Sequence, residues 1–215
     1  MPFTLDELRS DIVALDIYEV YQKYIISEDN WYFENILSSK IGNTAEIKES
    51  FNAIISTTFH VNPENIVMVG SGKTGYSLTP TAKDMEPKLF KSFCADGKER
   101  KSSDIDIAII SEPLFYHFWL LLRKSFQTRY IALYNHIPGA IYRGYINETN
   151  LERIAGCRKD WSNISGSSKK ELHSDLFIDH DIKYRIYRNW FDFEDYHLGA
   201  LKKIKREVSY GSAIS

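Results

Sequence analysis

Cysteine is scarce in this chain, since only Cys94 and Cys157 occur among 215 residues. Neither belongs to a CxxC pair or to a Cys/His spacing that binds zinc, so we expect neither a disulfide framework nor a structural zinc site. Long hydrophobic runs are also lacking, because the densest apolar patch, PLFYHFWLLL, is too short to span a bilayer and contains His117. The first residues, MPFTLDELRSD, show no secretion signal. The sequence therefore predicts a cytoplasmic protein that does not itself insert into a membrane.

A strong excess of charge is lacking too, because 27 basic and 29 acidic residues leave a formal charge of −2. This balance argues against a protein that coats nucleic acid by bulk positive charge, so any such contact needs a local basic cleft. Hydrophobic residues make up 43% of the chain and aromatic residues 14%, which is enough to bury a substantial core. We expect a single domain over residues 1–215.

The first sixty residues show the apolar spacing of helices. Thr4 and Glu7 form a capping-box pattern ahead of an apolar stripe, which predicts a helix that runs to about Ile25. After a short aromatic segment, Asn43 and Glu46 predict the start of another helix. The stripes consist of Leu5, Leu8, Ile12 and Leu15 in the first helix and of Ile47, Phe51, Ile54 and Ile55 in the second.

Strand patterns begin after these helices. NIVMV, residues 65–69, is short and rich in β-branched residues, and it ends at a glycine cluster, which predicts a buried strand. SSDIDIAII alternates, so Asp104 and Asp106 fall on one face of a strand and Ile105 and Ile107 on the other. Pro113 then opens an aromatic helix.

Later segments complete the expected organisation. DLFI and DIKYRIYR predict two more strands, and WFDFEDYHLGALKKIKREV predicts a closing amphipathic helix. We expect N-terminal helices over residues 1–60, a core over 61–188, a long insertion within that core at 78–101, and a C-terminal helix and tail over 189–215.

The segment VMVGSGKTGYSL, residues 67–78, suggests a phosphate-binding loop of one of several kinds. The P-loop pattern G-x-x-x-x-G-K-[ST] is incomplete, because residues of the apolar run stand where its first glycine belongs. Gly70, Gly72 and Gly75 match G-x-G-x-x-G, but the proline-containing segment that follows shows no helical stripe, as a dinucleotide-binding fold requires. Both interpretations are therefore disfavoured.

A third interpretation joins this segment to the aspartates downstream. Carboxylates at positions i and i+2 of a strand project to one side and can share divalent cations, and Mg²⁺ prefers few carboxylates together with phosphate oxygens and water. Gly70 and Ser71 let backbone N–H groups approach phosphates, and Lys73 can neutralise their charge. The two segments together predict a site for a cation-bound nucleotide.

A Gly-Ser turn followed on the next strand by Asp-x-Asp resembles the nucleotidyltransferase superfamily that includes DNA polymerase β. The resemblance implies an α+β fold with a small mixed sheet flanked by helices, and a Mg²⁺- or Mn²⁺-dependent transfer of NMP or dNMP from a nucleoside triphosphate such as ATP to a hydroxyl, with release of pyrophosphate. The family usually places the aspartates much closer to the serine than this chain does.

The resemblance assigns roles to particular residues. Asp104 and Asp106 become catalytic metal ligands, and a third carboxylate from a later strand completes the site, with Asp175 as first choice and Asp179 and Asp181 as alternatives. Gly70, Ser71 and Lys73 hold the triphosphate, and Tyr76 is placed to stack on a base. Arg185 and Arg188 either meet phosphate or pair with surface acids.

The order of the segments is also similar to the minimal nucleotidyltransferases of bacterial anti-phage operons, of which the Hailong system is an example. This similarity implies an oligonucleotide product or acceptor and an operon-encoded membrane effector as partner. Hydroxyls near the C-terminus offer a primer within the chain itself: Ser209, Tyr210, Ser212 and Ser215. The alternative is a nucleotide sensor or an antitoxin-like partner that binds without catalysis.

Overall fold

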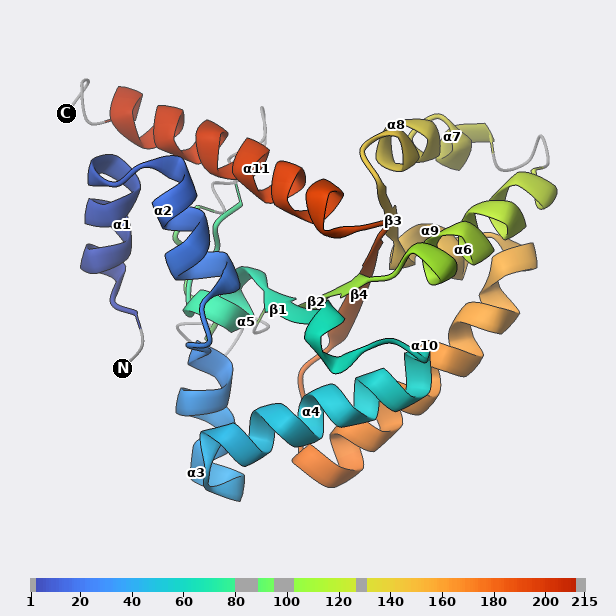
Figure 1. Cartoon of the computed structure of the whole chain (residues 1–215), viewed down its shortest axis with the longest axis horizontal. Helices are drawn as coiled ribbons and strands as arrows, with labels where there is room; N and C mark the ends of the chain where they lie inside the picture. The colour runs from blue at the N-terminus through green and yellow to red at the C-terminus, as the bar shows by residue number, and fades with distance from the viewer. Residues whose placement is uncertain (1–2, 80–88, 95–102, 127–130, 212–215) are drawn as a thin grey trace.

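The computed structural model describes residues 3–79, 89–94, 103–126 and 131–211 and shows an α+β fold, in which helices flank a small mixed sheet (Figure 1). The strands are β1 (Ile66–Val69), β2 (Ile105–Ile110), β3 (Tyr145–Asn147) and β4 (Ile182–Tyr187), in the order β1-β2-β4-β3. Strand β2 runs antiparallel to β1 and parallel to β4, whereas β3 pairs antiparallel with β4. The Asp-x-Asp strand is therefore an interior strand, and the expected α+β class with a small mixed sheet is confirmed.

The helical N-terminal segment is confirmed, but its first helix is shorter than predicted. The helix α1 (Leu5–Ala14) has Thr4 as its N-cap, as predicted, and the chain then breaks instead of continuing to Ile25. Asp16 causes the break, because its side chain accepts from the backbone N–H of Tyr18 at 2.8 Å and so caps a new helix. The elements that follow are α2 (Ile17–Tyr21), η1 (Gln22–Ile26), η2 (Phe33–Leu37), α3 (Ser38–Ile41), α4 (Thr44–Phe59) and η3 (Pro63–Asn65).

The remaining helices include one that corrects a predicted strand. They are α5 (Gly70–Thr74), α6 (Glu112–Lys124), α7 (Ile131–Tyr134), α8 (Ile137–Tyr142), α9 (Glu148–Arg153), α10 (Ala155–Leu176) and α11 (Trp190–Gly211). The segment DLFI is not a strand: Asp175 and Leu176 belong to the last turn of α10, which ends at Phe177 in the left-handed conformation. DIKYRIYR does contain a strand, β4, and the predicted closing helix is α11.

The sheet separates two hydrophobic cores of different character. On one face Ile105, Ile107 and Ile109 pack against residues from α4, α6 and α10. On the other face Ala108 and Ile110 pack against α1, α2 and α11, which Figure 1 shows on the opposite side of the sheet from α4 and α10. Because strand side chains alternate, Asp104 and Asp106 lie on the second face, toward α11.

A candidate active site between the sheet and helix α11

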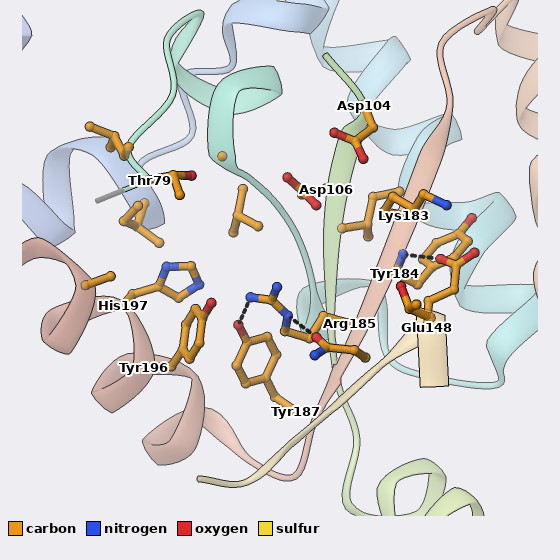
Figure 2. Close-up of a pocket in the computed structure, with 18 of the residues that line it drawn as sticks. Thr79, Asp104, Asp106, Glu148, Lys183, Tyr184, Arg185, Tyr187, Tyr196 and His197 are labelled. Carbon is orange, nitrogen blue, oxygen red and sulfur yellow. Dashed lines mark hydrogen bonds between the residues drawn. The ribbon is translucent and has the colours of Figure 1, made fainter. Parts of the chain in front are cut away.

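A cavity of about 460 Å³ opens on the sheet face that carries the aspartates (Figure 2). Its lining includes Asp104 and Asp106 from the β2 segment, Gly70 from the start of α5, Lys183 and Arg185 from β4, and Tyr196 and His197 from α11. The register of the parallel strands pairs Asp106 with Lys183, and paired residues present their side chains on the same face. The sheet thus sets two carboxylates beside two cations, and α11 forms the opposite wall.

The surroundings of Asp106 perturb the pKa of its carboxyl group. Its side chain is half-buried, and burial raises its pKa to about 6, with a further contribution from the negative charge of Asp104. The positive charges of Arg185 and Lys183 act in the opposite direction. The ionised carboxylate pair is therefore destabilised in the free protein, and a bound divalent cation would relieve this repulsion.

Gly70 brings the predicted Gly-Ser turn against the predicted aspartate. Its φ of +68° is a conformation that L side chains rarely adopt, and a Cβ at this position would lie 3.0 Å from Asp106 Oδ2. A glycine is required here because the backbone turns sharply beside the carboxylate. The structure therefore brings together two motifs that the insertion separates in sequence.

Arg185 is a half-buried cation without an acidic partner at ion-pair distance. Its Nε donates to Asn147 Oδ1 at 2.9 Å and its Nη1 to Tyr187 Oη at 3.3 Å, while the guanidinium lies 4.8 Å from the centre of the Tyr196 ring. Across the described ranges, no carboxylate lies within the 4.0 Å ion-pair distance of its guanidinium. These contacts fix the orientation of the guanidinium, and its charge is compensated only at longer range, by Asp106, which leaves its donors suited to an anionic ligand.

His197 adds a buried polar group to the same cavity. Only 8% of the residue is exposed, and its Nε2 has no hydrogen-bond partner in the part of the chain that the structure describes. Burial, followed by the charge of Arg185, lowers its pKa to about 3, so the imidazole is neutral at physiological pH. A buried polar atom without a partner is costly unless a ligand or water satisfies it.

The structure does not bring the predicted third carboxylate to this cavity. Asp175 is exposed on α10, Asp179 is exposed and pairs with Lys40 at 3.2 Å, and Asp181 is exposed just before β4. None of the three lines the cavity. The prediction of Asp175 depended on a strand at DLFI, and the neighbour of Asp106 on the actual adjacent strand is Lys183.

Glu148 does line the cavity, but its carboxylate is already engaged within the protein. It pairs with Lys169 and accepts from the backbone N–H of Tyr184 at 2.6 Å, while only 2% of its side chain is exposed. Within the described residues, no group of three or more His, Cys, Asp and Glu side chains is arranged to hold a metal ion. Among the described residues that line the cavity, the acidic ligands without such internal partners are therefore Asp104 and Asp106.

Three of the four residues predicted to bind the nucleotide lie outside the cavity lining. Ser71 is buried within α5, Tyr76 forms an isolated β-bridge with Ser92, and Lys73 lines a different cavity. Gly70 alone of this group lines the cavity with the aspartates. Of the insertion at 78–101, residues 80–88 and 95–101 lie outside the described residues, as do Ser212 and Ser215 of the tail.

Sequence reasoning missed several residues that the structure brings together here. Lys183, Tyr196, His197 and Asn147 had no assigned role, and Arg185 was one of two arginines with an open role. The alternation in DIKYRIYR already places Lys183 and Arg185 on one strand face. The alternation does not show, however, that this strand pairs with the Asp-x-Asp strand.

Comparisons with models of known families, with curated proteins and with solved structures find no significant match to this chain. Among the described helices, none combines the length and the apolar character that a membrane crossing requires.

Proposed function

We propose that this chain is a metal-dependent nucleotidyltransferase that transfers NMP or dNMP from a nucleoside triphosphate to a hydroxyl and releases pyrophosphate. The observation that carries the proposal is the composition of the cavity, in which a repelling carboxylate pair and a half-buried guanidinium without a close acidic partner share one space. A triphosphate chelated to a divalent cation presents both complements, a positive ion for Asp104 and Asp106 and phosphate oxygens for Arg185. The motif resemblance supports the same reaction class.

Mg²⁺ or Mn²⁺ fits the donor set of the cavity. Mg²⁺ is commonly bound by one or two carboxylates and by substrate phosphates, with water in its other positions, so Asp104 and Asp106 suffice as protein ligands. The ion would supply neutralisation of phosphate charge and activation of the attacking hydroxyl. Burial, and then repulsion from Asp104, disfavour the charged form of Asp106 and so raise its pKa, and a bound cation would stabilise that charged form.

The chain's own residues position the reactants. Arg185, held by Asn147 and Tyr187, presents fixed donors to the phosphates, and Lys183 adds a flexible charge from the same strand. Gly70 permits close approach beside Asp106. The neutral imidazole of His197 offers a buried polar atom to the nucleotide. Together these groups exclude water from one side of the phosphates and fix their orientation.

The acceptor proposed from the narrower resemblance is an oligonucleotide or the protein's own C-terminal hydroxyls, with an operon-encoded membrane effector as the recipient of the product in anti-phage defence. The helix α11 connects the cavity to the tail, because it carries both His197 and Ser209. These residues are roughly 18 Å apart along the helix axis, at a rise of about 1.5 Å per residue. Priming on Ser209 of an intact α11 would therefore use the tail of a second copy.

The test is incubation of the full chain with labelled NTPs and dNTPs and Mg²⁺, followed by separation of free products from protein-linked ones. We expect pyrophosphate and a labelled product, which the double variant Asp104→Asn with Asp106→Asn does not form. The matched control is Asp160→Asn on α10, which removes a carboxylate outside the cavity lining. If pyrophosphate release from the Asp104/Asp106 double variant equals that from the wild type, the proposal is wrong.

Intact mass measurement after the same incubation tests the acceptor separately. A mass increase by whole nucleotide residues indicates attachment to the chain, and loss of the increase on truncation at residue 208 locates it in the tail. An unchanged mass combined with free oligonucleotide removes self-priming and leaves the transferase intact.

Binding without catalysis is the second candidate, and one observation favours it: β4 places Lys183, not a carboxylate, beside Asp106. A nucleotide sensor or antitoxin-like partner would bind NTP through Lys183 and Arg185 and release no pyrophosphate. Equilibrium binding of a non-hydrolysable NTP analogue, measured with the turnover assay, separates the two candidates. Release of orthophosphate instead of pyrophosphate would indicate a phosphate-hydrolysing protein.

A further inference from the structure

A second cavity, of about 350 Å³, lies beside the other end of the GSGKT turn. Its lining includes Lys73 from α5, Lys48 and Asn52 from α4, Ser27 from the end of η1, and Trp190 from the start of α11. No residue lines both this cavity and the one that contains Asp106. The proposed transferase function therefore leaves this cavity, and the lysine of the glycine-rich motif, without a role.

Lys73 is a buried cation with little compensation. Only 4% of the residue is exposed, and its amine donates to the backbone carbonyl of Ser27. No carboxylate of the described residues lies within 4.0 Å of this amine. Lysine is rarely buried without an ionic partner, because an unpaired charge loses its hydration.

The surroundings of Lys73 are electrostatically unfavourable for its charge. Burial lowers its pKa to about 8, and the positive charge of Lys48 acts in the same direction. The nearby Asp29 and Glu28 oppose this effect without cancelling it. Two ammonium groups that repel each other around one cavity would both be stabilised by an anion placed between them.

Uncharged donors lie around the same space. Ser27 Oγ is buried and has no hydrogen-bond partner among the described residues, and the half-buried amide of Asn52 also lines the cavity. Lys48 pairs with Glu28 at 3.2 Å, but 41% and 93% of their side chains are exposed. Such a surface pair contributes little to stability, so Lys48 can turn to a ligand at little cost.

Two exposed acids, Glu28 and Glu64, and the buried Asn30 also line the cavity, and the rest of the lining is apolar and aromatic. Phe33, Phe51, Ile66 and Met68 line the interior, and Trp190 has 41% of its surface exposed, with its indole N–H donating to Asn65 Oδ1 at 3.1 Å. The cavity volume lies within the range typical of small-molecule sites, about 300 to 1,000 Å³. A ligand with an anionic head and a flat, largely apolar body matches this lining.

We propose that the Lys73 cavity binds the phosphate monoester of a small, flat molecule, such as a nucleoside monophosphate. The phosphate would contact Lys73, Lys48 and Ser27, and the flat body would lie against Met68 and Trp190. A monoester carries a charge of about −1.5 to −2 at pH 7, which matches two ammonium groups better than a single carboxylate does. Charge-assisted hydrogen bonds to the phosphate would give Lys73 the anionic partner that it lacks among the described residues.

Adenosine 5′-monophosphate, inorganic phosphate and adenosine serve as probes, in calorimetric titrations of the full-length chain. We expect AMP to bind, phosphate to bind more weakly at the same site, and adenosine not to bind measurably. Lys73→Met should weaken AMP binding by about 10- to 100-fold, since a hydrogen bond to a charged group contributes about 1.5 to 3 kcal/mol. Lys124→Met, an exposed lysine on α6, is the matched control and should change the affinity less than about twofold.

The Arg185→Met variant shows which cavity is measured, because it alters the first cavity alone. AMP binding that survives Arg185→Met and is lost in Lys73→Met supports the proposal. Equal affinities of Lys73→Met and Lys124→Met, or loss of AMP binding in Arg185→Met alone, would overturn it. This outcome is independent of turnover, so failure here leaves the transferase proposal untouched.

A purely structural role of Lys73 gives a different pattern. If the amine only holds the Ser27 carbonyl, Lys73→Met lowers the melting temperature and leaves AMP affinity unchanged in the folded fraction, which contradicts the proposal. Should Lys73→Met not fold, Ser27→Ala replaces it, because this change removes only the buried hydroxyl. A several-fold loss of AMP affinity is then expected, and an unchanged affinity would count against the site.

Discussion

The two faces of strand β2 differ in what they do for the molecule. Ile105, Ile107 and Ile109 on one face are each at most 1% exposed and belong to one continuous apolar core. On the other face Asp104 is exposed and Asp106 is half-buried. Further along the strand, Ala108 and Ile110 belong to the second core. Odd-numbered positions thus support folding, whereas the first even-numbered positions carry charge that costs stability. Substitutions on the two faces should therefore affect different measurements.

The largest expected effect is that of Asp106→Asn on turnover. Removing the half-buried carboxylate while keeping its shape should lower kcat/KM for pyrophosphate release by about 1,000-fold, the loss typical of a group that stabilises charge in the transition state. The free energy of unfolding at pH 7 should stay the same or rise, because the cost of burying the charge and the repulsion from Asp104 both disappear. Asp106→Asn that loses stability and activity together would contradict the division between the faces.

Ile109→Ala is the counterpart on the other face. Ile109 is fully buried between Ile66 of β1 and Ile186 of β4 and lines neither cavity. Truncation should lower the free energy of unfolding by about 3 kcal/mol through lost burial and a new cavity. Urea denaturation measures this loss, and kcat/KM per folded molecule should change less than about threefold. A large loss of kcat/KM in the folded fraction would show that the faces are coupled.

Arg185→Met should act mainly on substrate binding. Losing the guanidinium that Asn147 and Tyr187 orient should lower kcat/KM by roughly 30- to 100-fold, which corresponds to about 2 to 2.7 kcal/mol. Arg185→Lys keeps the charge but not the planar donor geometry, so it should recover only part of the loss. Steady-state kinetics over NTP concentration measures both variants. Full activity in Arg185→Met would remove this residue from the phosphate site.

The pH dependence of stability should reveal Asp106 directly. Its pKa is raised in the folded chain to about 6, so folding is favoured while the group is protonated and this contribution is lost as pH rises from about 4 to 6. Without divalent cations, the free energy of unfolding of the wild type relative to Asp106→Asn should fall by roughly 2 to 3 kcal/mol across that window. Mg²⁺ at pH 7 should recover part of the loss. If the difference in unfolding free energy between the two proteins stays constant from pH 4 to 7, the pKa of Asp106 is not raised in the folded chain.

In free energy, Gly70→Ala is expected to have the smallest effect of this series. The added methyl group meets Asp106 Oδ2 at 3.0 Å in a conformation with φ of +68°, so the turn or the carboxylate must shift. We expect about a tenfold loss of kcat/KM and a loss of about 1 to 2 kcal/mol in the free energy of unfolding. Gly166→Ala on α10, where the added Cβ meets nothing within 4 Å, is the matched control and should leave kcat/KM unchanged. Equal behaviour of the two variants would remove the special role of Gly70.

Local signals in the sequence predicted the strands β1, β2 and β4, the caps at Thr4 and Asn43, and the meeting of Gly70 with Asp106. Each depends on neighbouring residues or on a motif. The position of Lys183 beside Asp106 could not be predicted in this way, because strand pairing joins residues that are far apart in the chain. The choice of Asp175 as third carboxylate followed from the strand predicted at DLFI, which the structure replaces with the last turn of α10, outside the cavity lining.

The helix α10 was missed for a related reason. Its sequence contains Gly156, Gly166 and several serines, which are weak helix formers, so no clear apolar stripe appears. Packing stabilises it instead: the fully buried Trp161 lies 5.9 Å from the Phe59 ring and 5.4 Å from the Phe118 ring, measured between ring centres. Tertiary contacts thus override local propensity, as they do in most helices of proteins. The sequence likewise did not show that Lys73, in the five-residue helix α5, lines a different cavity from the aspartates.

The strand order β1-β2-β4-β3 also determines when the site can form during synthesis. β2 needs β4 on one side, yet residues 182–187 leave the ribosome well after residues 105–110, and β3 emerges between them without its partner. At a synthesis rate of about 5 to 20 residues per second, Lys183 and Arg185 are added to the chain roughly 4 to 15 seconds after the aspartates. A nascent chain that ends before β4 therefore carries the carboxylates without their facing cations, so the cavity with both kinds of charge forms only after β4 has been synthesised.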